Sequence, residues 1–224
     1  MSYVSGDLRD QLAHVGFDVV RSGLVVGSGG NLSAREPGGD ECWVTAAGTW
    51  LDRLDRPSFV RVRIADGSSS RRAGVAGSPE APVPSTELAL HLATYRARPD
   101  VNAVVHLHPQ TVVLLDALGE RIRLVTTDHA YYLRQVVSTP FRLPGSEELA
   151  TEAASAAATG VNCIVLGHHG CSVLGETVEW AHKRARNLEE AARLTYQALV
   201  VGALDRLPEC PAEFVTRLAS LPPP

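Results

Sequence analysis

The chain has 224 residues, of which 45% are hydrophobic and 21% charged, and its formal net charge is −4. These values are typical of one globular domain, and the excess of acidic residues, without any basic block, argues against a nucleic-acid partner. No apolar run reaches the roughly 18 residues that span a bilayer, and residues 1–10 lack the pattern of a signal peptide. We therefore expect a cytoplasmic protein with no membrane partner.

The cysteines and the lysine argue against three further kinds of chemistry. The cysteines are Cys42, Cys163, Cys171 and Cys210. None of them forms a CxxC pair, so we expect free thiols rather than a zinc knuckle or a disulfide framework. The single lysine, Lys183, lies among histidine and arginine residues in a charged segment. Covalent catalysis by lysine needs a desolvated amine, so this composition argues against a Schiff-base enzyme.

The first third of the chain predicts one helix and two strands. Apolar residues recur at helical spacing from residue 8 to residue 19, and the helix is expected to end at Gly23. A glycine-rich loop follows over residues 27–33. Short strands are expected over residues 42–45 and 60–64, where apolar and polar residues alternate in the second run.

The rest of the chain alternates between helices and strands after a long Gly-, Ser- and Pro-rich loop over residues 66–84. Ser85 is expected to cap a helix that ends at Pro99. Further helices are expected over residues 109–119, 146–158 and 178–201. Strands are expected over residues 101–106, 122–126, 135–139 and 162–166. We predict a single α/β domain over residues 1–207, with helices on both faces of a sheet, and a Pro-rich tail over residues 208–224.

Three histidines at two strand ends indicate a metal site. His106 and His108 are two residues apart at the end of an apolar strand, which directs both side chains to one face. The pair His168-His169 directly follows a second buried strand, and strand ends are where ligands gather in α/β sheets. Three neutral imidazoles with one open position are typical of catalytic zinc, whereas an HxH pair alone also occurs at ordinary strand ends.

Glu87 and His91 lie one helical turn apart at the start of the helix expected after Ser85. A carboxylate at this place can simply complement the helix dipole. His91 falls near the apolar stripe of the same helix, so we expect it to be packed or to support the site rather than to bind metal.

Three loops of small residues could hold an anion, namely residues 28–31, 45–48 and 85–86. Glycines let backbone N–H groups approach a ligand closely, and hydroxyls and a helix N-terminus add donors, so a phosphate can be held without lysine. The glycine-rich loop does not fit a dinucleotide motif, because no strand precedes it and no helix clearly follows it. A polar aromatic cluster over residues 128–132 is expected in a loop, where one phenol could donate a proton.

Taken in chain order, these segments resemble the class II aldolase and adducin-head family, and most closely its L-fuculose-1-phosphate aldolases. The resemblance covers about residues 8–201. It is carried by Gly30-Asn31-Leu32-Ser33, Thr45-Ala46-Ala47-Gly48, Pro84-Ser85-Thr86-Glu87 with His91, His106-Leu107-His108-Pro109, and His168-His169-Gly170. It implies an α/β/α sandwich with a mainly antiparallel or mixed central sheet, and a homotetramer with active sites at the subunit interfaces.

The resemblance also implies a role for each site residue. His106, His108 and His169 would bind one Zn²⁺ per chain, and Glu87 would be the catalytic acid/base, while His168 would not bind metal. The substrate phosphate would be bound by Ser28, Gly30, Asn31, Thr45, Gly48, Ser85 and Thr86. A hydroxyl common in the family is missing from Ala46-Ala47. The interfacial tyrosine of these aldolases falls near Thr126 or Thr127, so Tyr131 and Tyr132 are the candidate proton donors.

These roles predict an aldolase that reversibly cleaves a ketose 1-phosphate, such as L-fuculose 1-phosphate or a related deoxypentulose 1-phosphate, to dihydroxyacetone phosphate and an aldehyde. A 4-epimerase of this fold is a second hypothesis, although such enzymes carry His-Ala-Asp where this chain has Asp128-His129-Ala130. Decarboxylases and dehydratases remain alternatives. A non-catalytic interaction module like the adducin head is disfavoured, because a set of unused buried imidazoles gives no packing advantage.

Overall fold

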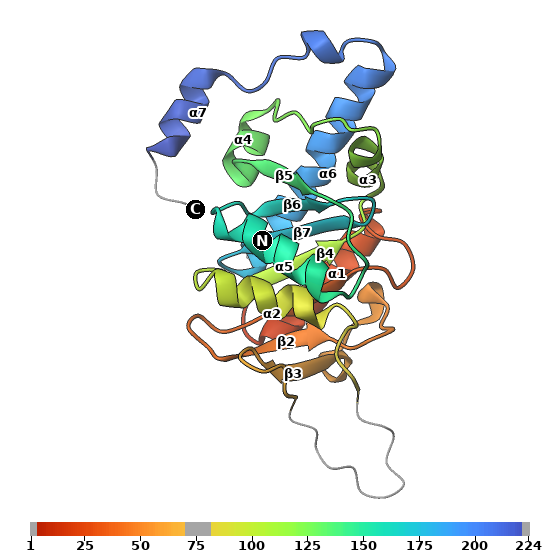
Figure 1. Cartoon of the computed structure of the whole chain (residues 1–224), viewed down its shortest axis with the longest axis vertical. Coiled ribbons are helices and arrows are strands. Elements are labelled where there is room, and N and C mark those ends of the chain that lie inside the picture. Colours follow the sequence, from red (N-terminus) through yellow and green to blue (C-terminus); the bar gives the residue numbers. More distant parts are fainter. Residues whose placement is uncertain (1–3, 70–81, 221–224) are drawn as a thin grey trace, which may run out of the picture.

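A seven-stranded sheet organises the protein in a computed structural model, which describes residues 4–69 and 82–220 (Figure 1). The strands are β1 (Asn31–Ala34), β2 (Glu41–Thr45), β3 (Phe59–Arg63), β4 (Ala103–Leu107), β5 (Val136–Thr139), β6 (Cys163–Leu166) and β7 (Gly170–Gly175). Their order across the sheet is β3-β2-β1-β4-β7-β6-β5, and every neighbouring pair is antiparallel except the parallel pair β5 and β6. The expected mixed sheet is confirmed, with β4 at its centre.

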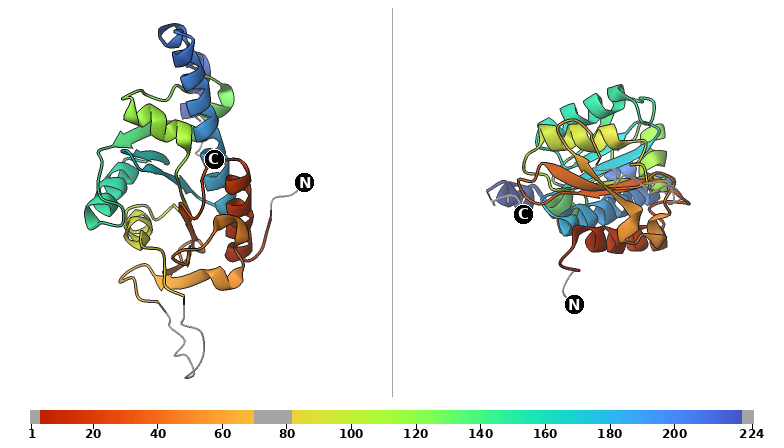
Figure 2. Two further views of the ribbon diagram at one scale, coloured as in Figure 1. Left: turned by 90° about the vertical axis from the view of Figure 1, so that its right-hand side faces the viewer. Right: turned by 90° about the horizontal axis from the view of Figure 1, so that it is seen from below.

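Helices cover both faces of this sheet (Figure 2). They are α1 (Leu8–Arg21), α2 (Leu88–Ala97), α3 (Gln110–Ala117), α4 (Thr127–Leu133), α5 (Glu147–Ala158), α6 (Val178–Val200) and α7 (Ala212–Ala219). Short 3-10 turns occupy Leu51–Arg53, Arg56–Ser58 and Leu204–Arg206. Helices α2 and α5 pack on one face, and α1, α3 and α6 on the other. The α/β/α sandwich is therefore confirmed.

The pleat of β4 and β1 divides their side chains between the two faces. Val105 of β4 and Leu32 of β1 belong to the apolar core under α1 and α6, whereas Val104 belongs to the core under α2 and α5. Period-2 alternation then places His106 of β4 and Asn31 of β1 on the α2 side. Asn31 and His106 are directly paired across the two strands. The site is therefore built between the centre of the sheet and helix α2.

Five local expectations differ from the structure. Part of the loop expected over residues 27–33 is strand β1, residues 122–126 form no strand, and residues 127–133 form helix α4 rather than a loop. Strand β7 and helix α7 were not expected; α7 lies in the segment that the sequence assigned to the tail, where the Cys210 amide also donates to the Leu124 carbonyl. No helix in the described part of the chain has the length and hydropathy of a membrane span.

The beginning of helix α2 also differs in detail from the expectation. Glu87, not Ser85, occupies the N-cap position of α2, and its side chain makes no capping hydrogen bond. The Ser85 hydroxyl accepts a hydrogen bond from the Glu87 amide at 3.3 Å. The loop expected over residues 66–84 lies partly outside the described residues. Residues 82–87 lead directly from this segment into the candidate site.

Candidate metal centre and active site

Three histidines converge at the ends of the central strands. His106 lies in β4 and His108 directly follows it, with their Nε2 atoms 3.0 Å apart, as the two-residue spacing predicts. His169 lies in the tight turn between β6 and β7, and its ring centroid is 4.8 Å from that of His106 and 5.0 Å from that of His108. The antiparallel pairing of β4 with β7 brings this turn beside the first pair.

Glu87 completes the cluster from the start of α2. Its Oε2 lies 3.0 Å from His106 Nε2, and its Oε1 lies 3.4 Å from His169 Nε2. One ligand atom from each of Glu87, His106, His108 and His169 lies within 4.8 Å of all the others. Glu87 and His106 are buried, and His108 and His169 are partly exposed. Such a cluster has the dimensions of a single-ion site that is open on one side.

The hydrogen bonds of the cluster fit a bound cation. The Cys171 carbonyl accepts from His106 Nδ1 at 2.9 Å, so His106 carries a proton on Nδ1. Its Nε2 then faces a carboxylate oxygen of Glu87 at 3.0 Å, a contact that requires positive charge on or beside this nitrogen. Glu87 Oε1 is also buried without a hydrogen-bond partner among the described residues. Imidazole nitrogens and a carboxylate oxygen are the ligands that catalytic Zn²⁺ takes.

The protonation states of the side chains suit the same role. Burial lowers the pKa of His108 to about 4 and also lowers the pKa of His169, so both imidazoles are neutral at neutral pH. Burial on its own raises the pKa of Glu87, but the contacts with His106 and Asn31 outweigh it and hold that pKa below its ordinary value. The cluster therefore offers an ionised carboxylate and imidazoles with free lone pairs.

A pocket of about 180 Å³ opens beside the cluster. It is lined by Ser28, Gly29, Gly30, Asn31, Ala46, Ala47, Gly48, Thr49, Ser85, Thr86, Glu87 and His108. All three loops that the sequence indicated for an anion meet here. The small and hydroxyl-bearing side chains of this lining suit a phosphate site, because they let an anion approach the backbone closely.

Two threonines at this pocket differ from the sequence-based prediction. Thr45 is buried and does not line the pocket, and its hydroxyl accepts a hydrogen bond from the Leu32 amide at 3.2 Å. Thr49 does line it, and its hydroxyl donates to the Ala46 carbonyl at 2.8 Å. Thr49 was missed because it lies one residue beyond the motif that ends at Gly48. The Thr49 hydroxyl therefore lies beside the Ala46-Ala47 turn, which has no hydroxyl of its own.

The two tyrosines lie apart from the cluster within this chain. Tyr131 and Tyr132 belong to helix α4, and their rings pack against each other and against Trp180 of α6, with centroids 5.1 to 6.0 Å apart. Neither tyrosine lines the pocket of about 180 Å³. The Tyr132 carbonyl accepts a hydrogen bond from the buried Arg184 guanidinium, which fixes α4 on α6.

Two further histidines near the site have distinct positions. His168 is exposed, has a left-handed backbone with φ 54°, and donates its backbone N–H to Asp116 at 2.9 Å. It lies outside the cluster formed by Glu87, His106, His108 and His169. His91 is fully buried in α2 and hydrogen-bonds to Asn31 and Ser33 instead of contacting the cluster.

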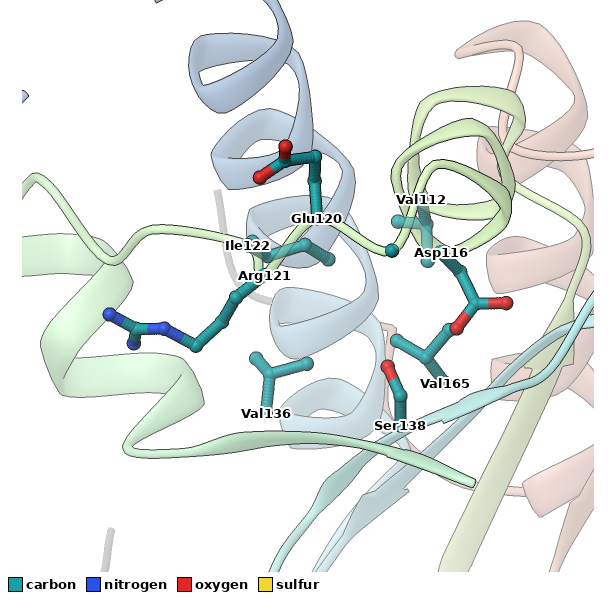
Figure 3. Close-up of a pocket in the computed structure, with 9 residues that line it drawn as sticks. Val112, Asp116, Glu120, Arg121, Ile122, Val136, Ser138 and Val165 are labelled. Carbon is teal, nitrogen blue, oxygen red and sulfur yellow. The ribbon is translucent and has the colours of Figure 1, made fainter. Parts of the chain in front are cut away.

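A larger pocket, of about 320 Å³, lies between α3 and strands β5 and β6 (Figure 3). Val112, Ile122, Val136 and Val165 form its apolar part, and Asp116 carries a carboxylate into it. No residue of the metal cluster lines this pocket. The smaller pocket differs in this respect, because Glu87 and His108 belong both to its wall and to the cluster of possible metal ligands.

The sequence matches the family described as Class II Aldolase and Adducin N-terminal domain over residues 10–196. The chain belongs to this family. An L-fuculose phosphate aldolase of Methanocaldococcus jannaschii is 32% identical over 177 residues, which cover 79% of this chain and 89% of that protein. A 3-oxo-tetronate 4-phosphate decarboxylase of Escherichia coli K12 is 31% identical over 198 residues, which cover 86% and 88%.

A solved structure of an L-fuculose 1-phosphate aldolase superimposes on this chain with a TM-score of 0.80, and the two sequences are 25% identical. The superposition covers 97% of this chain and 96% of that one. The family resemblance that five short motifs indicated therefore extends over the whole α/β/α sandwich.

Proposed function

We propose that this protein is a zinc-dependent aldolase that reversibly cleaves a ketose 1-phosphate to dihydroxyacetone phosphate and an aldehyde. The observation that carries the proposal is the direct contact between a metal-ligand cluster and an anion pocket, which share Glu87 and His108. L-fuculose 1-phosphate and related deoxypentulose 1-phosphates are the proposed substrates.

The proposed roles follow from the side chains of the site. The phosphate is bound by the loops that carry Ser28, Gly30, Asn31, Gly48, Ser85 and Thr86. Thr45 stabilises these loops, because its hydroxyl accepts a hydrogen bond from the Leu32 amide. His106, His108 and His169 hold Zn²⁺, which acts as a Lewis acid towards the negative charge that develops beside the breaking carbon–carbon bond. The chain needs no lysine for this chemistry.

Glu87 moves the proton at the reacting carbon. Asn31 and His106 both contact Oε2, whereas Oε1 has no hydrogen-bond partner among the described residues and lies 3.4 Å from His169 Nε2, so we assign the proton transfer to Oε1. In the direction of condensation, Oε1 takes a proton from the hydroxymethyl carbon of dihydroxyacetone phosphate. In the direction of cleavage, the same oxygen returns a proton to that carbon after the aldehyde has left.

The proposed assembly is a homotetramer, in which Tyr131 or Tyr132 of one chain reaches the site of the next. A phenol there would protonate the aldehyde oxygen as the new bond forms. Support comes from the position of both tyrosines outside the pocket of their own chain.

A decarboxylase is the second candidate function. It is favoured by the E. coli relative named as a 3-oxo-tetronate 4-phosphate decarboxylase, with which this chain shares 31% identity over 86% of its length. Both reactions break a carbon–carbon bond beside a carbonyl in a phosphorylated substrate, and they differ in whether an aldehyde or carbon dioxide leaves. A panel of ketose 1-phosphates and 3-oxo acid phosphates, assayed for both products, distinguishes them.

Glu87→Gln tests the central role. We expect the variant to lower the rate of stereospecific hydrogen exchange at the hydroxymethyl carbon of dihydroxyacetone phosphate by about 10²-fold or more, because it removes the proton acceptor. Its metal content should stay nearly unchanged, since three histidines remain. Loss of the metal would instead make Glu87 a fourth ligand, and exchange at the wild-type rate would assign the proton transfer to another group.

A further inference from the structure

A buried chain of hydrogen bonds leads from the core to Glu87. The Tyr95 and Ser33 hydroxyls lie 2.7 Å apart, and Ser33 Oγ lies 2.7 Å from His91 Nδ1. His91 Nε2 lies 2.5 Å from Asn31 Oδ1, and Asn31 Nδ2 donates to Glu87 Oε2 at 2.9 Å. All five residues are at least 93% buried. Helix α2 and strand β1 contribute to this chain in alternation.

The direction of every hydrogen bond in this chain follows from its last member. The Asn31 Nδ2 donates to the Glu87 carboxylate, so the Asn31 carbonyl oxygen is turned towards His91. His91 must then donate from Nε2. Burial lowers the pKa of His91 to about 3, so the ring is neutral and its Nδ1 carries no proton. Ser33 therefore donates to Nδ1, and Tyr95 donates to Ser33.

The chain of hydrogen bonds allows only one orientation of the Asn31 side-chain amide. A reversed Asn31 amide would bring its carbonyl oxygen against Glu87 Oε2 at 2.9 Å, where two acceptors repel each other. The Nε2–H of His91 holds the other end of the amide in the same orientation, because it donates to Asn31 Oδ1. Through Asn31, this hydrogen bond engages Glu87 Oε2, while Oε1 has no hydrogen-bond partner among the described residues.

We propose that His91 is a positioning residue, which holds the Asn31 amide and, through it, the Glu87 carboxylate in the orientation for proton transfer. His91 itself touches neither substrate nor metal. The inference rests on the proposed role of Glu87 as acid/base, and it adds a requirement for one particular tautomer of a histidine that lies deep in the core.

Two substitutions of His91 separate positioning from simple filling of the core. His91→Gln places an amide N–H where Nε2–H was, whereas His91→Asn places its amide at the level of Nδ1 and leaves Asn31 without its donor. Both variants remove the ring. We expect the Gln variant to catalyse hydrogen exchange on dihydroxyacetone phosphate about tenfold or more faster than the Asn variant, the scale of one hydrogen bond to a charged network.

The same two variants carry controls that do not depend on turnover. Zinc content should be equal in both, because His106, His108 and His169 are unchanged and none of them contacts Asn31 or His91 in the hydrogen-bond chain. Equal exchange rates in the two variants would overturn the proposal. Loss of zinc in both would also overturn it, because His91 would then maintain the whole site rather than one carboxylate.

A spectroscopic measurement on the wild-type protein keeps the inference testable if either variant does not fold. Long-range ¹H–¹⁵N correlation of zinc-loaded protein should show His91 as the neutral Nε2–H tautomer throughout the neutral pH range. The Nδ1–H tautomer or a doubly protonated ring would overturn the proposal. If the wild type exchanges no hydrogen with dihydroxyacetone phosphate, the proposed function fails, while the tautomer still decides the role of His91.

Discussion

The carboxylate of Glu189 in helix α6 accepts a hydrogen bond of 2.6 Å from the hydroxyl of Thr111 in the first turn of helix α3. The second carboxylate oxygen accepts from the Val112 amide at 3.2 Å, and the side chain is almost fully buried. Helix α3 begins two residues after His108. Glu189 therefore anchors the segment that carries His108, a proposed metal ligand, to helix α6.

Glu189→Ala is expected to lower the free energy of unfolding by about 2 kcal/mol or more, because it leaves a buried amide and a hydroxyl unpaired. Urea unfolding measures this change, and zinc titration should show weaker binding. The matched control is Glu190→Ala, which removes an exposed carboxylate from the next position and should change stability by less than about 0.5 kcal/mol. Equal effects of the two substitutions would contradict the anchoring role.

Gly30→Ala should disrupt the site more than its backbone strain alone explains. Gly30 has φ 76°, and a Cβ there would lie 2.6 Å from the His106 carbonyl oxygen. Gly38 has φ 73° with nothing within 4 Å of a Cβ, so Gly38→Ala reports the strain alone, about 1 kcal/mol. We expect Gly30→Ala to cost more in urea unfolding and to weaken inorganic phosphate binding, whereas Gly38→Ala leaves that binding intact.

Removal of the metal should abolish turnover while the fold persists. The two apolar cores on either face of the sheet contain no metal ligand, so circular dichroism should change little after chelation. Metal analysis should find one divalent ion per chain. His169→Asn should lose this ion and His168→Asn should retain it, because His168 lies outside the cluster. Full activity in metal-free protein would refute the proposed chemistry.

His91 should make the protein less stable as the pH falls. Its pKa is about 3 in the folded chain, against an ordinary value of 6.5, so the unfolded chain binds an additional proton between these values. The free energy of unfolding then decreases as the pH drops below about 6.5, by up to about 1.4 kcal/mol per pH unit from this group. Urea unfolding at about pH 7 and about pH 5 should show a smaller decrease for His91→Gln. The same pH dependence in both proteins would assign the effect to other groups.

Subunit mixing tests the proposed role of the tyrosines. Sedimentation should show a tetramer, and Tyr131→Phe or Tyr132→Phe should lower cleavage by about 10²-fold if that phenol donates the proton. Mixed with Glu87→Gln chains, the inactive tyrosine variant should regain activity, because some sites then combine an intact Glu87 with an intact tyrosine from the neighbour. An active monomer, or mixtures without recovery, would show that each chain works alone.

The elements that the sequence predicted are those with a clear apolar period. Helices α1, α2, α5 and α6 follow a 3.6-residue period, and the two-residue spacing of His106 and His108 places both rings on one face. Strand β1 was missed because it has only four residues and directly follows Gly29-Gly30, so its segment was interpreted as part of a glycine-rich loop. Helix α4 is short, and its start at Thr126 is fixed by a capping box closed with a histidine rather than the usual glutamate.

The hydrogen-bond chain behind Glu87 was only partly visible in the sequence. Glu87, His91 and Tyr95 recur every four residues, which places them on one side of α2, and Asn31 and Ser33 share one face of β1. These two spacings are local signals. The pairing of that helix side with that strand face is a tertiary arrangement that no local spacing encodes, which is why His91 was expected only as a packed or supporting residue.

The donors of the metal cluster and the walls of the anion pocket come from different parts of the architecture. The histidines arise at the central strands β4 and β7, whereas most of the pocket wall belongs to the loops at residues 28–30 and 46–49. Directed evolution could therefore exchange those loops and select new substrates while the chemistry stays the same. The resulting variants would share the same central sheet and differ only in the loops that form the pocket wall.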